Sequence, residues 1–220
     1  MSFINFHNLL IKKSKVISRK GLYHFLAEQY DLIPDKSKIL LVGSGGKIAD
    51  HLYKFASRKL FMVISIDIDS TKKPDIIGDV CLYEFGEDKY DAIIMAEVLE
   101  HFHNPQKSIV NIHKSLKKGG KAIITVPFIF PIHDRPYDYF RFTRYGLELL
   151  LKDFESIFIK DRNNWGEAIS TLMARHSFEN HMGKYFMLLM ALSFYPLFFF
   201  LGKVFKTDFF TTGYFAVATK

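Results

Sequence analysis

Glycines and a carboxylate that follow short apolar runs are the residues best placed to hold a ligand. Gly43, Gly45 and Gly46 follow one such run, and glycines there let the backbone turn tightly and approach a ligand without a clash at Cβ. Their spacing excludes a dinucleotide-binding GxGxxG turn, because Ile48 stands where the third glycine would be. Asp67 ends the next apolar run, and a carboxylate at that position can accept hydrogen bonds from both ribose hydroxyls of a nucleoside. The pattern therefore indicates a nucleoside-binding site.

A second set of polar residues follows the strand expected at 122–126 and could act on an acceptor molecule. A histidine can take a proton from a hydroxyl near neutral pH, which makes His133 a candidate general base. The alternative is that His133 holds its loop by a hydrogen bond to Asp134 or Asp138. Arg141 can bind a phosphate or a carboxylate through two hydrogen bonds, or it can pair with Asp138. Tyr139 is the third candidate for contact with the acceptor.

These residues need a scaffold that brings the ends of several strands to one edge. Short runs of β-branched residues alternate along the chain with amphipathic stretches, which is typical of βαβ units in a parallel sheet. Lysines and glycines at 117–120 are expected to end a helix. The expected strands are 38–42, 62–66, 92–95, 122–126, 156–160 and 214–219, and the expected helices are 48–57, 105–116 and 143–152. The sequence therefore predicts an α/β fold with a Rossmann-like, mostly parallel sheet and helices on both faces.

The order of these elements resembles that of class I S-adenosylmethionine-dependent methyltransferases. After the glycine turn and Asp67 comes Gly-Asp-Val at 78–80, followed by Tyr-Asp-Ala-Ile-Ile-Met-Ala-Glu-Val-Leu-Glu-His at 90–101. Together the motifs cover residues 38–128, and their order and spacing match the family. The resemblance implies that S-adenosylmethionine is the cofactor and that the last strand of the sheet is antiparallel.

The resemblance also implies a role for each residue of the cofactor site. The three glycines of the turn would approach the methionine part and the ribose, and Asp67 would hold the ribose hydroxyls. Asp79, with Val80 beside it, would accept a hydrogen bond from the adenine amino group. Ala96 and Glu97 would border the methionine end.

The segment 131–143 resembles a subgroup of small methyltransferases linked to cell-surface polysaccharide and lipid-linked sugar synthesis. It reads Pro-Ile-His-Asp-Arg-Pro-Tyr-Asp-Tyr-Phe-Arg-Phe-Thr. The resemblance implies a small-molecule acceptor, a sugar or lipid-linked saccharide hydroxyl. Two alternatives stay open: a prenylated or other lipophilic ring as the substrate, and a non-catalytic cofactor-binding partner subunit. Leu41 suggests the partner subunit, because the family often has an acid there, two residues before the first glycine.

The composition limits the kind of protein that this chain can be. Its 220 residues suit a single methyltransferase domain over 1–220. Cys81 is the only cysteine, so an intramolecular disulfide is excluded, no metal site is expected, and a cytoplasmic setting is the simplest interpretation. The formal charge of +7 suits an anionic partner, but no aromatic and basic module indicates nucleic-acid binding. The segment 1–30 is expected to contain a basic amphipathic helix, either solvated or facing a membrane or substrate.

The unusual part of the chain is a helical insertion at 163–212. Within it, residues 185–202 carry no charge and include five phenylalanines, with Lys184 and Lys203 on either side. This length approaches that of a transmembrane helix, but a simple span would separate the last strand from its sheet. Pro196 favours a kink or a hairpin within the run, and we expect a re-entrant or in-plane hydrophobic hairpin on the inner face of the membrane. A buried helix pair or the interface of a homo-oligomer is the alternative.

Overall fold

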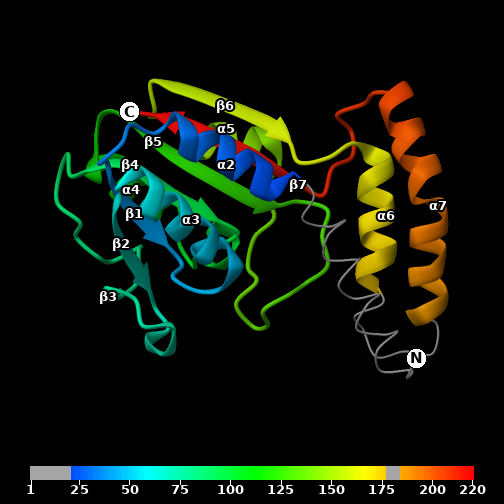
Figure 1. Cartoon of the computed structure of the whole chain (residues 1–220), viewed down its shortest axis with the longest axis horizontal. Helices are drawn as coiled ribbons and strands as arrows, with labels where there is room; N and C mark the ends of the chain where they lie inside the picture. Colours follow the sequence, from blue (N-terminus) through cyan, green and yellow to red (C-terminus); the bar gives the residue numbers. More distant parts are fainter. Residues whose placement is uncertain (1–20, 177–183) are drawn as a thin grey trace. The chain divides into compact units, whose positions relative to one another are not determined.

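The computed structural model describes residues 21–176 and 184–220 (Figure 1). Most of the segment 1–30, expected to contain a basic helix, lies outside the described residues. The chain divides into two compact units. The larger unit comprises Tyr23–Pro127, Asp134–Lys160 and Tyr214–Lys220, and the smaller is formed mainly by Phe128–His133 and Asp161–Gly213. The single domain expected over 1–220 stays a prediction.

The larger unit is built on a seven-stranded sheet with the strand order β3-β2-β1-β4-β5-β7-β6. The strands are β1 (Lys38–Val42), β2 (Met62–Asp67), β3 (Ile76–Ile77), β4 (Tyr90–Ala96), β5 (Leu116–Pro127), β6 (Ser156–Asp161) and β7 (Gly213–Thr219). The helices are α2 (Leu22–Leu32), α3 (Gly46–Lys59), α4 (Pro105–Ser115) and α5 (Arg144–Leu150), with the short 3₁₀ helices η1 (Ser70–Lys72) and η2 (Leu99–His101). In Figure 1, α2 and α3 lie on one face of the sheet, and α4 and α5 on the other.

The central strands are parallel, and their carboxyl ends meet at one edge. β1 pairs with β2 on one side and with β4 on the other, so that Val42 lies opposite both Ile66 and Met95. Nearly all residues of β1 and β4 are buried, as expected for strands that helices cover on both faces. The segments that follow β1, β2 and β4 are therefore brought to the same edge of the sheet.

The strand β7 runs antiparallel to β5. At one end, Gly119 N donates to Lys220 O over 2.6 Å, and Lys220 N donates to Gly120 O over 3.0 Å. At the other end, Phe128 N donates to Thr212 O over 2.8 Å. Late residues of one strand thus lie opposite early residues of the other. The expected α/β fold, Rossmann-like with a mostly parallel sheet and an antiparallel last strand, is confirmed.

The segment 117–120 differs from its expectation as a helix end. The helix α4 already ends at Ser115, and 117–120 belong to the start of β5. A Cβ atom at Gly120 would lie 2.8 Å from Lys117 O and 3.2 Å from Asp91 O. The glycine is therefore required by the bend of β5 toward its own Lys117 O and by the close approach to β4, where the pairing of the two strands shifts its register.

The smaller unit contains two antiparallel helices that lie side by side (Figure 1). They are α6 (Trp165–His176) and α7 (Lys184–Val204). Near the start of α6, Trp165 Nε1 donates to Phe205 O, just beyond α7, over 2.8 Å. Near its end, Ala174 packs with Leu188 and Ala191 from the first half of α7.

The apolar run forms one helix, so of the kink and the hairpin expected at Pro196 the hairpin is wrong. Pro196 lies inside α7. A proline in a helix costs about 3 kcal/mol, but contacts with α6 hold the chain on both sides of this residue, through the packing of Ala191 and through the hydrogen bond from Trp165 to Phe205 O just beyond α7. The hairpin is formed instead by α6 and α7. Among the described residues, Phe186–Val204 is the one helix that is long and apolar enough to cross a membrane by length and composition.

Candidate functional site

The glycine turn connects β1 to α3 at the carboxyl edge of the sheet. Gly43 has a φ of +86°, and its N–H donates to Ile66 O over 2.9 Å. A Cβ atom at Gly43 would lie 2.7 Å from Val98 Cγ1, so the conformation and the space both require glycine. The helix α3 begins at Gly46, with Gly45 as its N-cap. The turn therefore presents main chain and the amino end of a helix at this edge.

Asp67 ties the end of β2 to the glycine turn. Its Oδ2 accepts from Ser44 N over 2.9 Å and from Ser44 Oγ over 3.3 Å, and its Oδ1 accepts from Asp69 N over 2.9 Å. Lys72 Nζ lies 3.9 Å from Oδ2. A carboxylate has about four lone-pair sites, so these contacts orient Asp67 and leave acceptor capacity for a ligand.

Asp69 has a different role from Asp67. It caps η1 by accepting from Thr71 N over 2.9 Å and from Thr71 Oγ1 over 2.6 Å. These hydrogen bonds, first that of the Thr71 hydroxyl, lower the pKa of the exposed Asp69 carboxyl. Asp69 therefore belongs to the local structure of the loop.

Asp79 lies on the turn after β3, close to Asp67 in the backbone. The residue before Asp79 donates its N–H to Asp67 O over 3.0 Å. Asp79 Oδ1 accepts from Cys81 N over 2.8 Å, and Oδ2 lies 3.5 Å from His103 Nδ1. Val80 is buried. The turn thus holds the Asp79 carboxylate at a defined position beside the end of β2.

Glu97 directly follows β4 and has a positive φ of +56°. Its Oε1 accepts from Thr125 Oγ1 over 2.8 Å, and its N–H donates to Thr125 O over 2.9 Å. A positive φ in a non-glycine residue is strained, and such residues gather at functional sites. Ala96, the preceding residue, is buried. The larger unit therefore brings all the predicted cofactor residues to one edge of its sheet.

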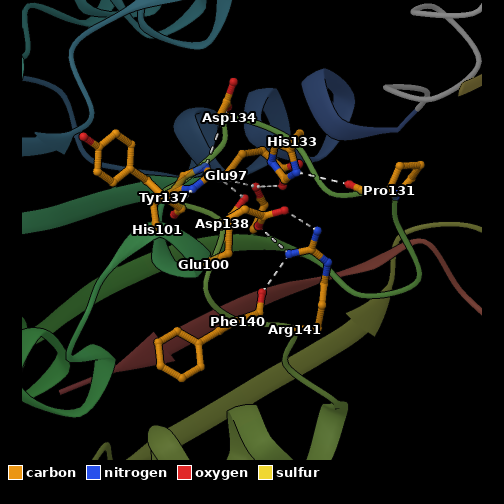
Figure 2. Close-up of polar contacts among 11 residues, drawn as sticks. Glu97, Glu100, His101, Pro131, His133, Asp134, Tyr137, Asp138, Phe140 and Arg141 are labelled. Carbon is orange, nitrogen blue, oxygen red and sulfur yellow. Dashed lines mark hydrogen bonds and ion pairs between the residues drawn. The ribbon is translucent and has the colours of Figure 1, made fainter. Parts of the chain in front are cut away.

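Arg141 pairs with Asp138 on the acceptor side (Figure 2). Its two terminal nitrogens donate to the two carboxylate oxygens over 2.5 and 2.7 Å. The hydrogen bonds to Asp138 raise the pKa of the guanidinium above its usual value. Of the two arrangements expected for Arg141, the structure therefore has the pair with Asp138, whose side chain is buried.

His101 anchors residues 134–143, called here the acceptor-side segment, a role that the sequence did not reveal. Its Nδ1 lies 2.9 Å from Tyr137 O, and its Nε2 lies 3.8 Å from Asp134 Oδ2 (Figure 2). Because a carbonyl only accepts, the hydrogen bond requires a proton on Nδ1. Tyr139 N also donates to Glu100 O over 3.0 Å, while the Tyr139 side chain is exposed. The segment is thus docked on η2 with a tyrosine open to solvent.

His133 belongs to the smaller unit. Its Nδ1 lies 3.3 Å from Pro131 O, and its ring stands edge-on to the Phe130 ring, with the centroids 5.6 Å apart. These contacts fix the histidine within its own loop. Its role as general base stays a prediction.

Comparison with family models identifies a methyltransferase domain at residues 18–181. The chain belongs to the methyltransferase domain family. The matched residues include every predicted cofactor residue. The prediction of a class I S-adenosylmethionine-dependent methyltransferase is confirmed at the level of the family and the fold. Among curated proteins, no sequence matches the methyltransferase.

Solved structures share this fold at low sequence identity. Phosphoethanolamine N-methyltransferase 2 from Haemonchus contortus, in complex with S-adenosylmethionine, is 16% identical, with a TM-score of 0.60 over 91% of this chain and 52% of that chain. The present chain thus spans about half the length of that protein. An S-adenosylmethionine-dependent methyltransferase from Archaeoglobus fulgidus is 12% identical, with a TM-score of 0.61 over 92% and 94% of the two chains. The [4+2]-cyclase SpnF is 13% identical, with a TM-score of 0.58 over 96% and 81%, so the likeness shows the fold and not one chemistry.

Proposed function

We propose that the protein uses S-adenosylmethionine to methylate a hydroxyl of a small acceptor, a sugar or a lipid-linked saccharide, at the cytoplasmic face of a membrane. The observation that carries the proposal is the convergence of the glycine turn, Asp67, Asp79 and Glu97 at one sheet edge of a methyltransferase domain. When bound, S-adenosylmethionine supplies the methyl group, which passes to the acceptor oxygen as its bond to sulfur breaks and the hydroxyl proton leaves.

The residues at this edge fit the proposed cofactor. Gly43 leaves main chain where a side chain would block close approach. Asp67 keeps acceptor capacity for ribose hydroxyls, and Asp79 offers a carboxylate to the adenine amino group. Leu41 departs from the family pattern and is fully buried in β1. No carboxylate therefore stands at that position for the amino group of the cofactor, and weaker binding is expected at that end.

The acceptor side supplies groups for orientation and proton transfer. Much of the acceleration of a transfer reaction comes from holding the reacting atoms in line. The docked segment offers the exposed Tyr139 hydroxyl and the fixed charge of Arg141 for that purpose. His133 is the proposed base that takes the hydroxyl proton.

An exposed apolar stripe on α7 supports the membrane part of the proposal. At about 100° per residue, its members lie on the side of α7 opposite Leu188 and Ala191, which pack on α6. The members of the stripe are Phe186, Leu189, Leu197, Phe200 and Val204. Only 17% of an 18-residue stretch within Phe186–Val204 is buried within the chain. An apolar stripe of this length needs a cover, since exposure costs about 25 cal/mol per Å².

A bilayer surface is the cover that agrees best with the neighbouring charges. Lys203 is exposed at the end of the stripe, with its Nζ 4.5 Å from the centre of the Phe199 ring, and a lysine there can reach headgroups while its stem covers apolar surface. Glu167 of α6 accepts from Tyr195 Oη over 3.3 Å, which sets a carboxylate against the second half of α7. A carboxylate is costly at the bilayer centre, so an in-plane position of the hairpin is favoured over a span.

Incubation of the purified protein with methyl-labelled S-adenosylmethionine and extracted lipid-linked saccharides tests the proposal. We expect label on a saccharide hydroxyl and one S-adenosylhomocysteine for each methyl group transferred. Label on a lipophilic ring would favour the alternative substrate. Cofactor binding by calorimetry without turnover on any acceptor would favour the partner subunit, and absence of cofactor binding would end the proposal.

A further inference from the structure

Three potential metal ligands lie together on the larger unit, at the turn after β3 and in the segment before α4. They are Asp79, Cys81 and His103, and their ligand atoms all lie within 4.8 Å of one another. The distance from Asp79 Oδ2 to His103 Nδ1 is 3.5 Å. All three side chains belong to the larger unit, so their distances to one another do not depend on the position of the smaller unit.

These separations are close to those of ligands around one metal ion. Zinc binds thiolate sulfur at about 2.3 Å and histidine nitrogen or carboxylate oxygen at about 2.0 to 2.2 Å, in tetrahedral geometry, which places ligand atoms roughly 3.3 to 3.8 Å apart. The Asp79 and His103 atoms already meet this requirement. We propose that Asp79, Cys81 and His103 form a three-ligand site for a divalent transition metal of the zinc type.

The local hydrogen bonds leave the ligand atoms available. Cys81 N donates to Asp79 Oδ1 over 2.8 Å, which leaves Oδ2 turned toward His103. Cys81 Sγ donates to Asn104 O over 3.3 Å. On binding, a sulfur–metal bond replaces the S–H bond, and the proton passes to water without any redox change. The His103 side chain is 60% exposed, so an ion can reach the imidazole from solvent, and three ligands leave a fourth position for water.

The site shares Asp79 with the proposed adenine contact. A metal ion on Asp79 Oδ2 would occupy the carboxylate oxygen that faces away from the Cys81 N–H. A metal ion and the cofactor therefore compete for the Asp79 carboxylate, and zinc inhibits cofactor binding. This second step rests on the proposed function, whereas the metal site itself does not.

Cobalt(II) is the probe for the site, because a cobalt–thiolate bond gives a charge-transfer absorption in the near ultraviolet. Cys81 is the only cysteine in the chain, so the band reports this position alone even if other histidines bind the metal. We expect a saturable band with one equivalent of cobalt that zinc abolishes. Cys81→Ser should remove the band. Its absence in the unmodified protein would overturn the proposal.

Two further variants separate a three-ligand site from a thiol that binds metal alone. His103→Gln should weaken cobalt binding by more than the roughly 10- to 100-fold found for loss of an outer-shell partner. The matched control is His113→Gln, a histidine on α4 that packs on the Phe154 ring and should leave the affinity unchanged. Equal affinity in His103→Gln and the unmodified protein would overturn the three-ligand site.

Competition is measured by the same band in the presence of S-adenosylhomocysteine. Saturating S-adenosylhomocysteine should raise the cobalt concentration at half-saturation at least tenfold. If the metal-free protein binds S-adenosylhomocysteine by calorimetry and the cobalt titration does not shift, the competition is wrong. If the metal-free protein does not bind S-adenosylhomocysteine, the proposed function fails while the metal site stands on its own band.

Discussion

At the scale of single residues, Asp67 combines an observed role with a proposed one, because the oxygens that orient the loop are also those proposed to meet the ribose. Its carboxylate accepts from Ser44 N and Asp69 N. Asp67→Ala removes a charged acceptor for two hydroxyls, which should weaken S-adenosylhomocysteine binding by about 1.5 to 3 kcal/mol. Isothermal titration calorimetry measures the change.

The neighbouring acid provides the matched control for this measurement. Asp69 is exposed and bonds mainly to Thr71, so Asp69→Ala should leave the affinity nearly unchanged. Asp67→Asn keeps the shape of the side chain and should lie between the two. Unchanged affinity in a folded Asp67→Ala protein would show that Asp67 serves only the loop.

A substitution of His133 distinguishes its proposed role as a general base from a purely structural role. As a general base it serves turnover only, so His133→Ala should lower kcat by roughly 100-fold or more and leave the affinity for S-adenosylhomocysteine intact. Steady-state kinetics and calorimetry on the same preparation measure both. Full activity, or loss of the folded state by circular dichroism, would mean that contacts such as that with Pro131 O are its whole role.

Sequence reasoning could predict which residues gather at the carboxyl edge of the sheet because their signals are local. A glycine turn after an apolar strand and an acid at the end of the next strand, such as Asp67, are each visible in a few residues. The contact of His101 with Tyr137 joins positions 36 residues apart, and no local pattern records it. The binding partner of Arg141 could not be predicted either, because the same sequence is compatible with an arginine that binds a ligand and with one that binds Asp138.

At the scale of elements, the strands were predictable where burial on both faces dictates a continuous apolar run. The expected strand 38–42 is β1 without any change of bounds. The two-residue strand β3 was missed because so short a strand carries no periodic signal. The run 117–120 looked like a helix end because a close approach of strands and a helix cap both select glycine.

The docking of the acceptor-side segment on η2 gives a prediction for His101. His101→Ala removes the contact with Tyr137 O, a bond worth about 1 kcal/mol. The amides of Tyr139 and Phe140, which donate to Glu100 O, should then exchange with solvent faster, and KM for the acceptor should rise. Hydrogen–deuterium exchange and kinetics measure the two effects.

A histidine on another element gives the comparison for that variant. His24→Ala removes an exposed imidazole next to Glu28 on α2 and should change neither quantity. If the amides of Tyr139 and Phe140 exchange as slowly in His101→Ala as in the unmodified protein, that result would contradict an anchoring role.

The stripe on α7 predicts the behaviour of the protein on lipid vesicles. Leu197→Glu and Phe200→Glu place charges on the stripe, and each buried side chain of this size is worth about 1.5 to 3 kcal/mol. Each change should therefore weaken binding to anionic vesicles about tenfold or more in a flotation assay.

An exposed leucine outside the stripe controls for added charge. Leu149 on α5 is 68% exposed, so Leu149→Glu adds the same charge to the larger unit and should bind vesicles like the unmodified protein. Equal loss in all three variants would assign the effect to charge alone. A stable dimer that ignores vesicles would support the homo-oligomer instead.

At the scale of the whole molecule, the path of the chain limits how the hairpin can meet a bilayer. The chain enters the smaller unit from β6 and returns to the same sheet as β7. The start of α6 and the end of α7 should therefore lie on the same side of the bilayer, and the proposed in-plane position of the hairpin keeps both ends of α7 at the cytoplasmic face. Single cysteines at 184 and 206, in a Cys81→Ser background, should resist an impermeant thiol reagent in intact cells and react after the cells are opened.

The labelling pattern distinguishes the hairpin from a span. Reaction of one cysteine and not the other in intact cells would mean that α7 crosses the bilayer. Reaction of Asp208→Cys, an exposed residue beyond α7, should follow that of position 206. A disagreement between these two neighbours would point to local shielding and not to the membrane.

The place of β7 between β5 and β6 also sets an order of events during synthesis. Residues 213–219 fill the gap between two strands that are made earlier, so a growing chain holds an incomplete sheet until they emerge. The hairpin of α6 and α7 leaves the ribosome before them. At about 5 to 20 residues per second, the apolar helix is synthesised before the sheet can close, so that under the proposed membrane association a bilayer would receive α7 before the sheet of the larger unit is complete.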